Sequence, residues 1–429
     1  MEFFGRIEQL VSGLGPQLGL FALLGLIVLL VSLSILTITR SRKALLLCLV
    51  LCMPFAGFVV SSVDAAATLL RWLIIFFLAA SGIHGLRSPG GSNLWLGVFG
   101  VVTLVAAVFS PYPLVALQFS LLWITLTWLV AASWASEIRR VEDIHAFIKI
   151  LLVGAGLYVL LAITQLPTFR GGTRFAGTST GAPVFVITGG LLMPVALWTV
   201  LYLKEKRWRN FALFLTVAIA TLLAFSGQRT GTYAGVIACV PIVWRFTPRS
   251  IAVTSFGLTM VVIAIWVVAV LFPEQTEFAV KRYSSLDVTG RGVRWRQGWE
   301  ICSQTPFFPH GVKPHVDFHN AYFEAWFRGG LQGLIIILCA QVTLGWQSWK
   351  LIRSRRHQEF SAIGRLTFGI LLFVVASSLP EDKLISPSNM TIFMTVLFGV
   401  IASRANALLA RERAQLRAER LQQPAAVEA

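Results

Sequence analysis

Charged residues are scarce in this chain. They make up 13% of its 429 residues, whereas a soluble domain carries roughly 25%. Hydrophobic residues reach 56% and the mean hydropathy is +0.76. Apolar runs of span length recur along the chain, and they do not alternate in the ten-residue pattern of a membrane barrel. A lipid-embedded backbone must satisfy its own hydrogen bonds, so the composition predicts an all-α polytopic membrane protein.

Several motifs are also missing. The five cysteines form no disulfide framework or CxxC metal site, and Cys302 is alone in a long polar segment. We find no phosphate-binding P-loop, no GxGxxG before a helix and no fixed-period repeat. Residues 1–9 lack the basic start and small-residue cleavage site of a signal peptide. Without a sizeable cytoplasmic domain, a nucleotide-sugar donor on that side is not expected, and neither a cofactor nor a metal is predicted.

The apolar runs predict about thirteen spans. If all of them cross the membrane, the N-terminus lies outside. It lies inside if one early segment is re-entrant or merged with its neighbour, and the 44–83 region is the candidate because Asp64 and Arg71 interrupt it. The predicted spans are 18–38, 44–62, 66–83, 94–110, 113–135, 145–165, 183–203, 210–225, 231–245, 251–272, 321–346, 363–379 and 388–403.

The formal net charge of +17 does not indicate nucleic acid, because most Lys and Arg sit in short loops at span ends. Such loops mark the cytoplasmic side of a membrane protein. The six basic loops contain Arg40/Arg42/Lys43, Arg87, Arg139/Arg140, Lys204/Lys206/Arg207/Arg209, Arg245/Arg249 and Lys350/Arg353/Arg355/Arg356. The resulting division is spans and short loops over 1–272, an external loop over 273–320, further spans over 321–403 and a cytoplasmic tail over 404–429, helical to about residue 422.

One long polar excursion separates the spans, inside the stretch Phe272–Gly333. Arginines in this excursion and in two other loops break the positive-inside pattern, and they lie on the predicted outer face. Arginine at membrane depth is costly unless it meets an anion, and its fork fits phosphate oxygens. The set therefore predicts a site for a lipid-linked diphosphate; the alternative for each is snorkelling to lipid phosphate or pairing with a nearby Asp or Glu. The residues are Arg170, Arg174, Arg229, Arg291, Arg294 and Arg296.

His319 is the candidate general base, because it lies where the excursion re-enters the membrane and imidazole titrates near neutrality. A capping or packing role is the alternative for this residue. So is metal binding with His315 and Asp317, although no fourth ligand is evident. Asn320 is expected to cap the following helix.

Four further features of the sequence have expected roles. Arg328 is expected to pair with Glu324 at i, i+4, and Tyr233 to pack or to touch substrate. The glycines of the WFRGGLQGL stretch are expected to allow close helix approach. An acidic metal-binding pair at Glu381 and Asp382 is an alternative for the turn that contains them.

Four stretches together resemble the O-antigen ligase family, which includes lipopolysaccharide O-antigen ligases, O-antigen polymerases and bacterial O-oligosaccharyltransferases. RFAGTSTGAPVF (174–185) resembles an external Arg-containing segment of the family, and SGQRTGTYAG (226–235) its Ser-x-Ser-Arg turn, with Gly227 and Gln228 as departures. TGRGVRWRQGWE (289–300) is similar to the Arg-then-Trp loop motif. The most specific match is HNAYFEAWFRGGLQGL (319–334), where Phe323 replaces Leu.

The resemblance implies a GT-C-like glycosyltransferase of about twelve membrane helices in the bacterial inner membrane, with a large periplasmic loop. It implies an inverting transfer of O-antigen from undecaprenyl diphosphate to lipid A–core, without a nucleotide. His319 would be the base; Arg229 and Arg291 would hold the diphosphate, assisted by Arg174 and by Arg294 or Lys313.

Polymerase and protein-glycosylating members would share these residues, so the acceptor stays open. A transporter or flippase of an anionic lipid-linked glycan is the rival from another class, although no matched pair of broken spans is evident. The enzyme interpretation predicts that Arg174, Arg229, Arg291 and His319 converge in one external cavity.

Overall fold

The computed structural model describes residues 42–55, 71, 74–75, 86–166, 175–176, 182–244, 248–284, 289–311, 318–381, 383–386 and 389–422. Every regular element in these ranges is helical and none is a strand, which confirms the all-α prediction. Nine helices in the described ranges are long and apolar enough to cross a membrane. The predicted span 18–38 and nearly all of 66–83 lie outside these ranges, so the total of about twelve stays a prediction.

The first half of the described chain follows the predicted spans closely. α3 ends at Cys52 and a 3₁₀ turn containing Pro54 follows it, while residues 56–62 of the predicted span 44–62 lie outside the described residues. η3 is a π-helical stretch in the middle of one continuous span, from Pro113 to Glu137. The elements are α3 (Arg42–Cys52), η1 (Met53–Phe55), α5 (Gly91–Ala106), η2 (Ala107–Phe109), α6 (Pro113–Ile124), η3 (Thr125–Val130), α7 (Ala131–Glu137) and α8 (Val141–Thr164).

The second half contains the remaining spans and the polar excursion. α11 is a short apolar helix of 15 residues, below the roughly 20 residues that cross a bilayer without help from neighbours. α17 continues as a helix to Gln422, as predicted for the tail. The elements are α9 (Ala182–Tyr202), α10 (Lys206–Phe225), α11 (Arg229–Val243), α12 (Pro248–Leu271), α13 (Pro273–Ser284), α14 (Thr289–Gln304), α15 (Ala321–Ile352), α16 (Gln358–Ser378), η5 (Lys383–Ile385) and α17 (Met390–Gln422).

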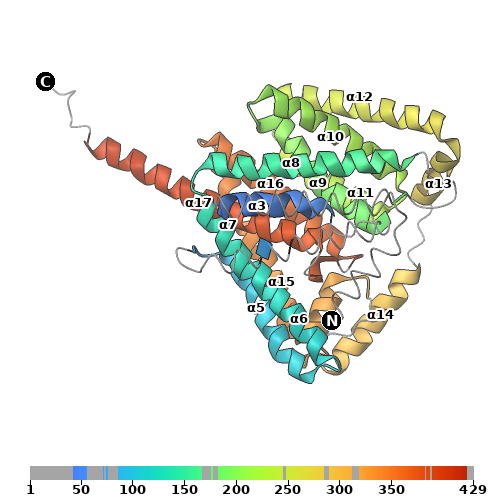
Figure 1. Cartoon of the computed structure of the whole chain (residues 1–429), viewed down its shortest axis with the longest axis vertical. Helices are drawn as coiled ribbons and strands as arrows, with labels where there is room; N and C mark the ends of the chain where they lie inside the picture. The colour runs from blue at the N-terminus through green and yellow to red at the C-terminus, as the bar shows by residue number, and fades with distance from the viewer. Residues whose placement is uncertain are drawn as a thin grey trace, which may run out of the picture.

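The centre of the bundle is formed by α9, α11 and α16, which pack at close range (Figure 1). A Cβ on Gly231 of α11 would lie 2.9 Å from the backbone of Val186 in α9, and one on Gly369 of α16 would lie 2.4 Å from the carbonyl oxygen of Ala238 in α11. Small residues therefore set these helix–helix distances. α12 lies at the edge of the bundle, and most of its described side chains are exposed.

The polar excursion is itself largely helical. α13 follows α12 at one edge of the molecule, and α14 lies beside the lower part of the bundle (Figure 1). A small, separate buried cluster contains Cys302 of α14, Phe327 of α15 and Phe318 from the turn before α15. α14 is thereby fastened to the beginning of α15.

α15 is interrupted at Gly330, which has φ +69° and ψ −175°. The segment before α15 uses the backbone groups at this break: Leu331 N–H donates to the Pro306 carbonyl at 2.8 Å, and His310 N–H to the Phe327 carbonyl at 2.8 Å. Only glycine adopts this conformation readily. Gly330 therefore allows the helix to break, which the expectation of close helix approach did not foresee.

Candidate functional site

Glu381 joins two segments that are distant in sequence. It lies in the turn after α16, and only 4% of the residue is exposed. Its Oε1 accepts a hydrogen bond from Arg291 Nη2 of α14 at 3.1 Å and another from Gln228 Nε2, just before α11, at 3.3 Å. A buried carboxylate requires such partners, so this contact fixes the three segments relative to one another.

The same turn also holds the start of α15. Ala321 N–H donates to the Glu381 carbonyl at 3.1 Å, and Asn320 Nδ2 donates to the Leu379 carbonyl at 2.8 Å. The Ala321 amide belongs to the first turn of a helix, where N–H groups have no partner within the helix. The α16–η5 turn supplies one, so the beginnings of α11 and α15 and the end of α16 lie at the same end of the bundle.

Local structure explains why Arg291 reaches this turn. The second half of α14 packs on α15, where Gly298 lies against Phe318 and Phe323. Its first half projects toward α11, and there Arg291 Nη1 donates to Thr230 Oγ1 at 3.2 Å. The Arg291 side chain is one-third exposed. Two groups, Thr230 and Glu381, therefore orient its guanidinium while a third of the side chain remains exposed.

His319 lies in the turn that enters α15, between buried Phe318 and the helix cap. Its φ is +48°, in the left-handed region that few residues other than glycine adopt. Asn320 follows as N-cap, and its Oδ1 accepts from the amides of Tyr322 and Phe323 at 2.9 and 3.1 Å. The predicted cap is confirmed, and it sets the position of the backbone on which His319 sits.

Arg229 is the first residue of α11 and follows Gln228 directly. The turn before it contains Gly227 at φ +62° and Ser226, whose Oγ accepts from the Gln228 amide at 3.2 Å. The segments carrying Arg229, Arg291 and His319 are thus all tied to the Glu381 turn. The roles predicted for these three side chains remain predictions.

The other sequence candidates lie at varying distances from this centre. Arg294 is exposed on the next turn of α14, and Tyr233 is 52% exposed one turn into α11. Arg174 and Lys313 lie outside the described residues. The predicted convergence of Arg174 with Arg229, Arg291 and His319 therefore stays a prediction.

Arg328 makes the predicted i, i+4 pair: its Nε donates to Glu324 Oε1 at 2.6 Å, and its guanidinium lies 4.4 Å from the Phe119 ring centroid. That geometry supports a structural role for Arg328.

Two alternatives from the sequence can be compared with these contacts. Arg291 does pair with a carboxylate, as the alternative for each outer arginine stated, and its partner is Glu381. Within the described residues no group of three His, Cys, Asp or Glu side chains is placed to hold a metal ion. His315, Asp317 and Asp382 lie outside those residues.

Sequence reasoning did not identify Glu381 as the connecting residue. It follows Pro380 in a short charged turn and carries no local signal of its partners, which are 90 and 153 residues away. Gln228 was noted only as a departure from a motif. The contact to Glu381 gives that departure a physical role.

A comparison with protein-family models matches residues 211–338 to the family described as O-Antigen ligase. The match runs from α10 through the first half of α15, so it contains Gln228, Arg229, Arg291 and His319, whereas Glu381 lies beyond it. Curated proteins give no match to the chain. Residues 211–338, set in a helical membrane architecture, therefore match the O-antigen ligase family.

Proposed function

We propose that this protein is an O-antigen ligase, which transfers O-antigen polysaccharide from undecaprenyl diphosphate to a sugar hydroxyl of lipid A–core. The observation that carries the proposal is the Glu381 turn, which holds an oriented outer arginine, Arg291, beside the segments of Arg229 and His319. An anion-binding group next to a candidate base is the combination that this transfer needs. The match of residues 211–338 to a family of glycosyltransferase-like enzymes supports the same interpretation. In this proposal the arginines bind the anion and His319 is the base.

In the proposed reaction, His319 accepts the proton of the acceptor hydroxyl. The oxygen attacks the anomeric carbon of the polysaccharide, and the bond from that carbon to the diphosphate oxygen breaks. Undecaprenyl diphosphate leaves with the electron pair, and the new glycosidic bond has inverted configuration. Base catalysis of this kind contributes about 10²–10⁴-fold.

Stabilising the negative charge that develops on the leaving diphosphate is expected to contribute more to the rate than base catalysis. Arg291 has N–H donors beyond the Nη1 and Nη2 contacts that Thr230 and Glu381 accept. A guanidinium fixed in advance is not reorganised when charge develops on the diphosphate, and one such donor is worth about 3–4 kcal/mol. Arg229 supplies a second cation, and Arg174, Arg294 and Lys313 are proposed to assist. A diphosphate is a good leaving group, so the mechanism requires neither a metal nor a cofactor.

The proposed setting is the bacterial inner membrane, with the Glu381 end of the bundle facing the periplasm. The loops predicted to be cytoplasmic are basic, and the helices described above are apolar enough to span. In this proposal the membrane-embedded donor and acceptor reach the site from the lipid, and neither a nucleic acid nor a nucleotide is required.

The test is reconstitution of the full chain with undecaprenyl-diphosphate-linked glycan and lipid A–core, in the presence of EDTA. Glycosylated lipid A–core supports the proposal and shows that no metal is required. Lengthened glycan on the lipid carrier would make the protein a polymerase, and glycan on an added acceptor protein would make it an oligosaccharyltransferase. Movement of the donor across the vesicle without transfer would indicate a transporter.

A further inference from the structure

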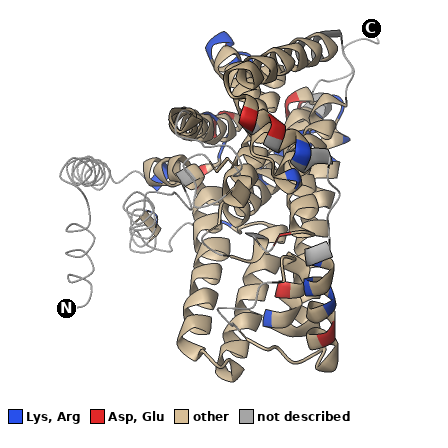
Figure 2. Ribbon diagram, turned by 90° about the vertical axis from the view of Figure 1, so that its right-hand side faces the viewer, with Lys and Arg blue, Asp and Glu red and all other residues tan. Residues whose placement is uncertain are grey.

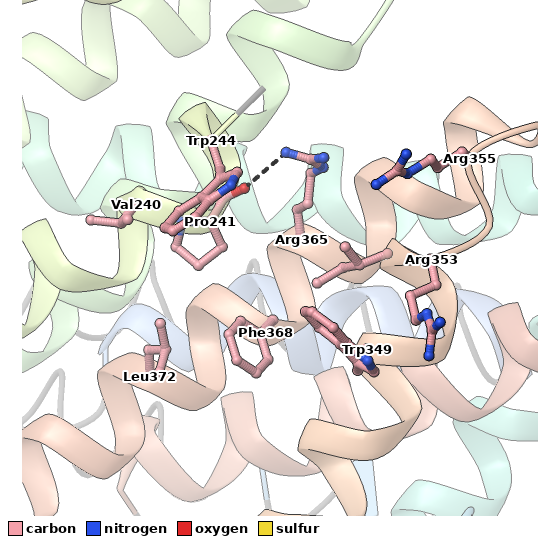
Figure 3. Close-up of a pocket in the computed structure, with 10 residues that line it drawn as sticks. Val240, Pro241, Trp244, Trp349, Arg353, Arg355, Arg365, Phe368 and Leu372 are labelled. Carbon is pink, nitrogen blue, oxygen red and sulfur yellow. Dashed lines mark hydrogen bonds between the residues drawn. The ribbon is translucent and has the colours of Figure 1, made fainter. Parts of the chain in front are cut away.

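A groove of about 910 Å³ opens at the other end of the bundle (Figure 3). It lies between α11, α15 and α16, and its walls are mostly apolar. Three arginines also line it: Arg365 of α16, with Arg353 and Arg355 of the turn between α15 and α16. Among the described residues that line it, none is acidic.

The chain itself places this groove far from the Glu381 turn. α11 begins at Arg229, one residue after Gln228, which donates to Glu381, and it contributes Val240 and Pro241 to the groove near its other end. α15 likewise begins at the Glu381 turn and reaches the groove with Trp349. At 1.5 Å per residue, the path along α11 from Arg229 to Val240 is roughly 16 Å. The groove is therefore separate from the site proposed for glycan transfer.

The groove is polar at one end and apolar at the other. Arg365, Phe368 and Leu372 have the i, i+3, i+7 spacing of one face of α16. Leu372 lies roughly 10 Å further along the helix axis, toward the Glu381 end. In Figure 3, the guanidinium groups of Arg353 and Arg355 lie at the opposite side from Val240 and Leu372. This gradient follows the direction expected for the span itself, from headgroup level to hydrocarbon.

Arg365 is held at the boundary between the two parts. Only 7% of the residue is exposed, and its Nη1 donates to the Pro241 carbonyl at 3.3 Å (Figure 3). That carbonyl belongs to the last turn of α11, where carbonyls have no partner within the helix. Trp244 and Trp349 flank the groove and are 68% and 46% exposed. Tryptophans with an apolar body and a polar N–H gather at the membrane–water boundary.

Figure 2 shows long stretches of the described bundle without Lys, Arg, Asp or Glu, which is the composition expected of helices embedded in lipid. A water-filled site for a free anion does not need a wall of Val, Phe and Leu, and a pocket for a neutral apolar chain does not need three arginines. Basic pockets between helices at the cytoplasmic side of a membrane bind anionic lipid headgroups. The groove combines both features in the order that a lipid presents them.

We propose that this groove is a binding site for an anionic glycerophospholipid. The phosphate group lies among Arg353, Arg355 and Arg365, and an acyl chain lies along Val240, Phe368 and Leu372. The site is independent of the glycan transfer proposed above, and it binds lipid whether or not the transfer assignment is correct. An anion at this end would also stabilise the contact between α11 and α16 that Arg365 makes through Pro241.

The test is native mass spectrometry of the full chain in mild detergent, titrated with phosphatidylglycerol, phosphatidylcholine or inorganic phosphate. Arg353 and Arg355 are exposed, and each basic residue near a membrane surface adds to the affinity for an anionic lipid. We therefore expect Arg353→Gln/Arg355→Gln to lower phosphatidylglycerol occupancy roughly tenfold or more. Val240→Trp fills the apolar part and is expected to reduce binding without altering charge. Arg356→Gln is the matched control, because Arg356 belongs to the same turn and does not line the groove.

Three outcomes would overturn the proposal. Equal retention of phosphatidylglycerol and phosphatidylcholine would remove the role of the arginines. An equal loss in Arg356→Gln would show that only the general charge of the turn matters. Binding of inorganic phosphate alone, unaffected by Val240→Trp, would show an anion site without a lipid. Size-exclusion profiles of each variant establish that it is folded before its occupancy is compared.

Discussion

Glu381→Gln is the substitution that most directly tests how the candidate site is held together. The amide has nearly the same shape as the carboxylate but no charge, so Arg291 loses its ionic partner while packing is preserved. A hydrogen bond to a charged group contributes about 1.5–3 kcal/mol, and breaking a fully buried pair costs about 3–5 kcal/mol. Because one-third of the Arg291 side chain is exposed, we expect a loss near the lower figure, about 2 kcal/mol.

The assay is a double-mutant cycle with Arg291→Gln, measured by reversible unfolding in mixed micelles. The account predicts a coupling free energy of about 1–2 kcal/mol between the two positions, since they share one interaction. Glu324→Gln is the control, because Glu324 pairs with Arg328 of its own helix and should be additive with Arg291→Gln. Additive effects of Glu381→Gln and Arg291→Gln, within about 0.5 kcal/mol, would refute the role assigned to Glu381.

Three further predictions concern the surroundings of the site. Gly330→Ala should destabilise the protein by roughly 1–3 kcal/mol, because φ is +69° and a Cβ would lie 2.6 Å from the Phe307 carbonyl oxygen; thermal unfolding measures this. Asn320→Ala should cost about 1 kcal/mol in the same measurement, because the α15 cap is lost. Cys302 should resist maleimide at neutral pH in the folded protein, because it is buried and burial raises the pKa of its thiol to about 12.

Each of these has its own control. Gly292→Ala, in α14, meets nothing within 4 Å and should be neutral or stabilising, so an equal effect at both glycines would contradict the account of the helix break. Asn320→Asp should keep the cap bonds to the Tyr322 and Phe323 amides and lose the donation to the Leu379 carbonyl, so a loss as large as that of Asn320→Ala would show that the Leu379 contact, and not the cap, is responsible. Cys302 should become reactive when the chain is unfolded. Rapid labelling of the native protein would contradict the burial of Cys302 between α14 and α15.

The membrane spans could be predicted from sequence because lipid requires long, continuous apolar helices. The predicted span 183–203 corresponds to Ala182–Tyr202, and 113–135 corresponds to Pro113–Glu137. Interactions within a single turn were also predictable. Asn320 caps α15, and Arg328 pairs with Glu324, because residues at these spacings meet wherever a helix forms.

Contacts between distant segments could not be predicted in the same way. Arg291 and Glu381 are 90 residues apart, and each lies in a polar stretch with several other charged residues. Which pair forms depends on the packing of α14 on α15, and no local pattern records it. The break at Gly330 likewise depends on backbone partners supplied by residues 306–310. The sequence alone could therefore nominate His319 and the outer arginines as candidates, because their residue types suit the chemistry. It could not identify Glu381 as the carboxylate that connects their segments.

The central claim is that His319 acts as a base in glycan transfer, and the initial rate of His319→Asn in the reconstituted reaction tests it most directly. Asparagine tolerates the left-handed backbone at φ +48°, so the turn is retained, and its amide does not accept a proton at neutral pH. The account predicts a rate about 10²–10⁴-fold below that of the unaltered protein, with binding of the diphosphate-linked donor preserved. A variant that transfers glycan at the unaltered rate would contradict it.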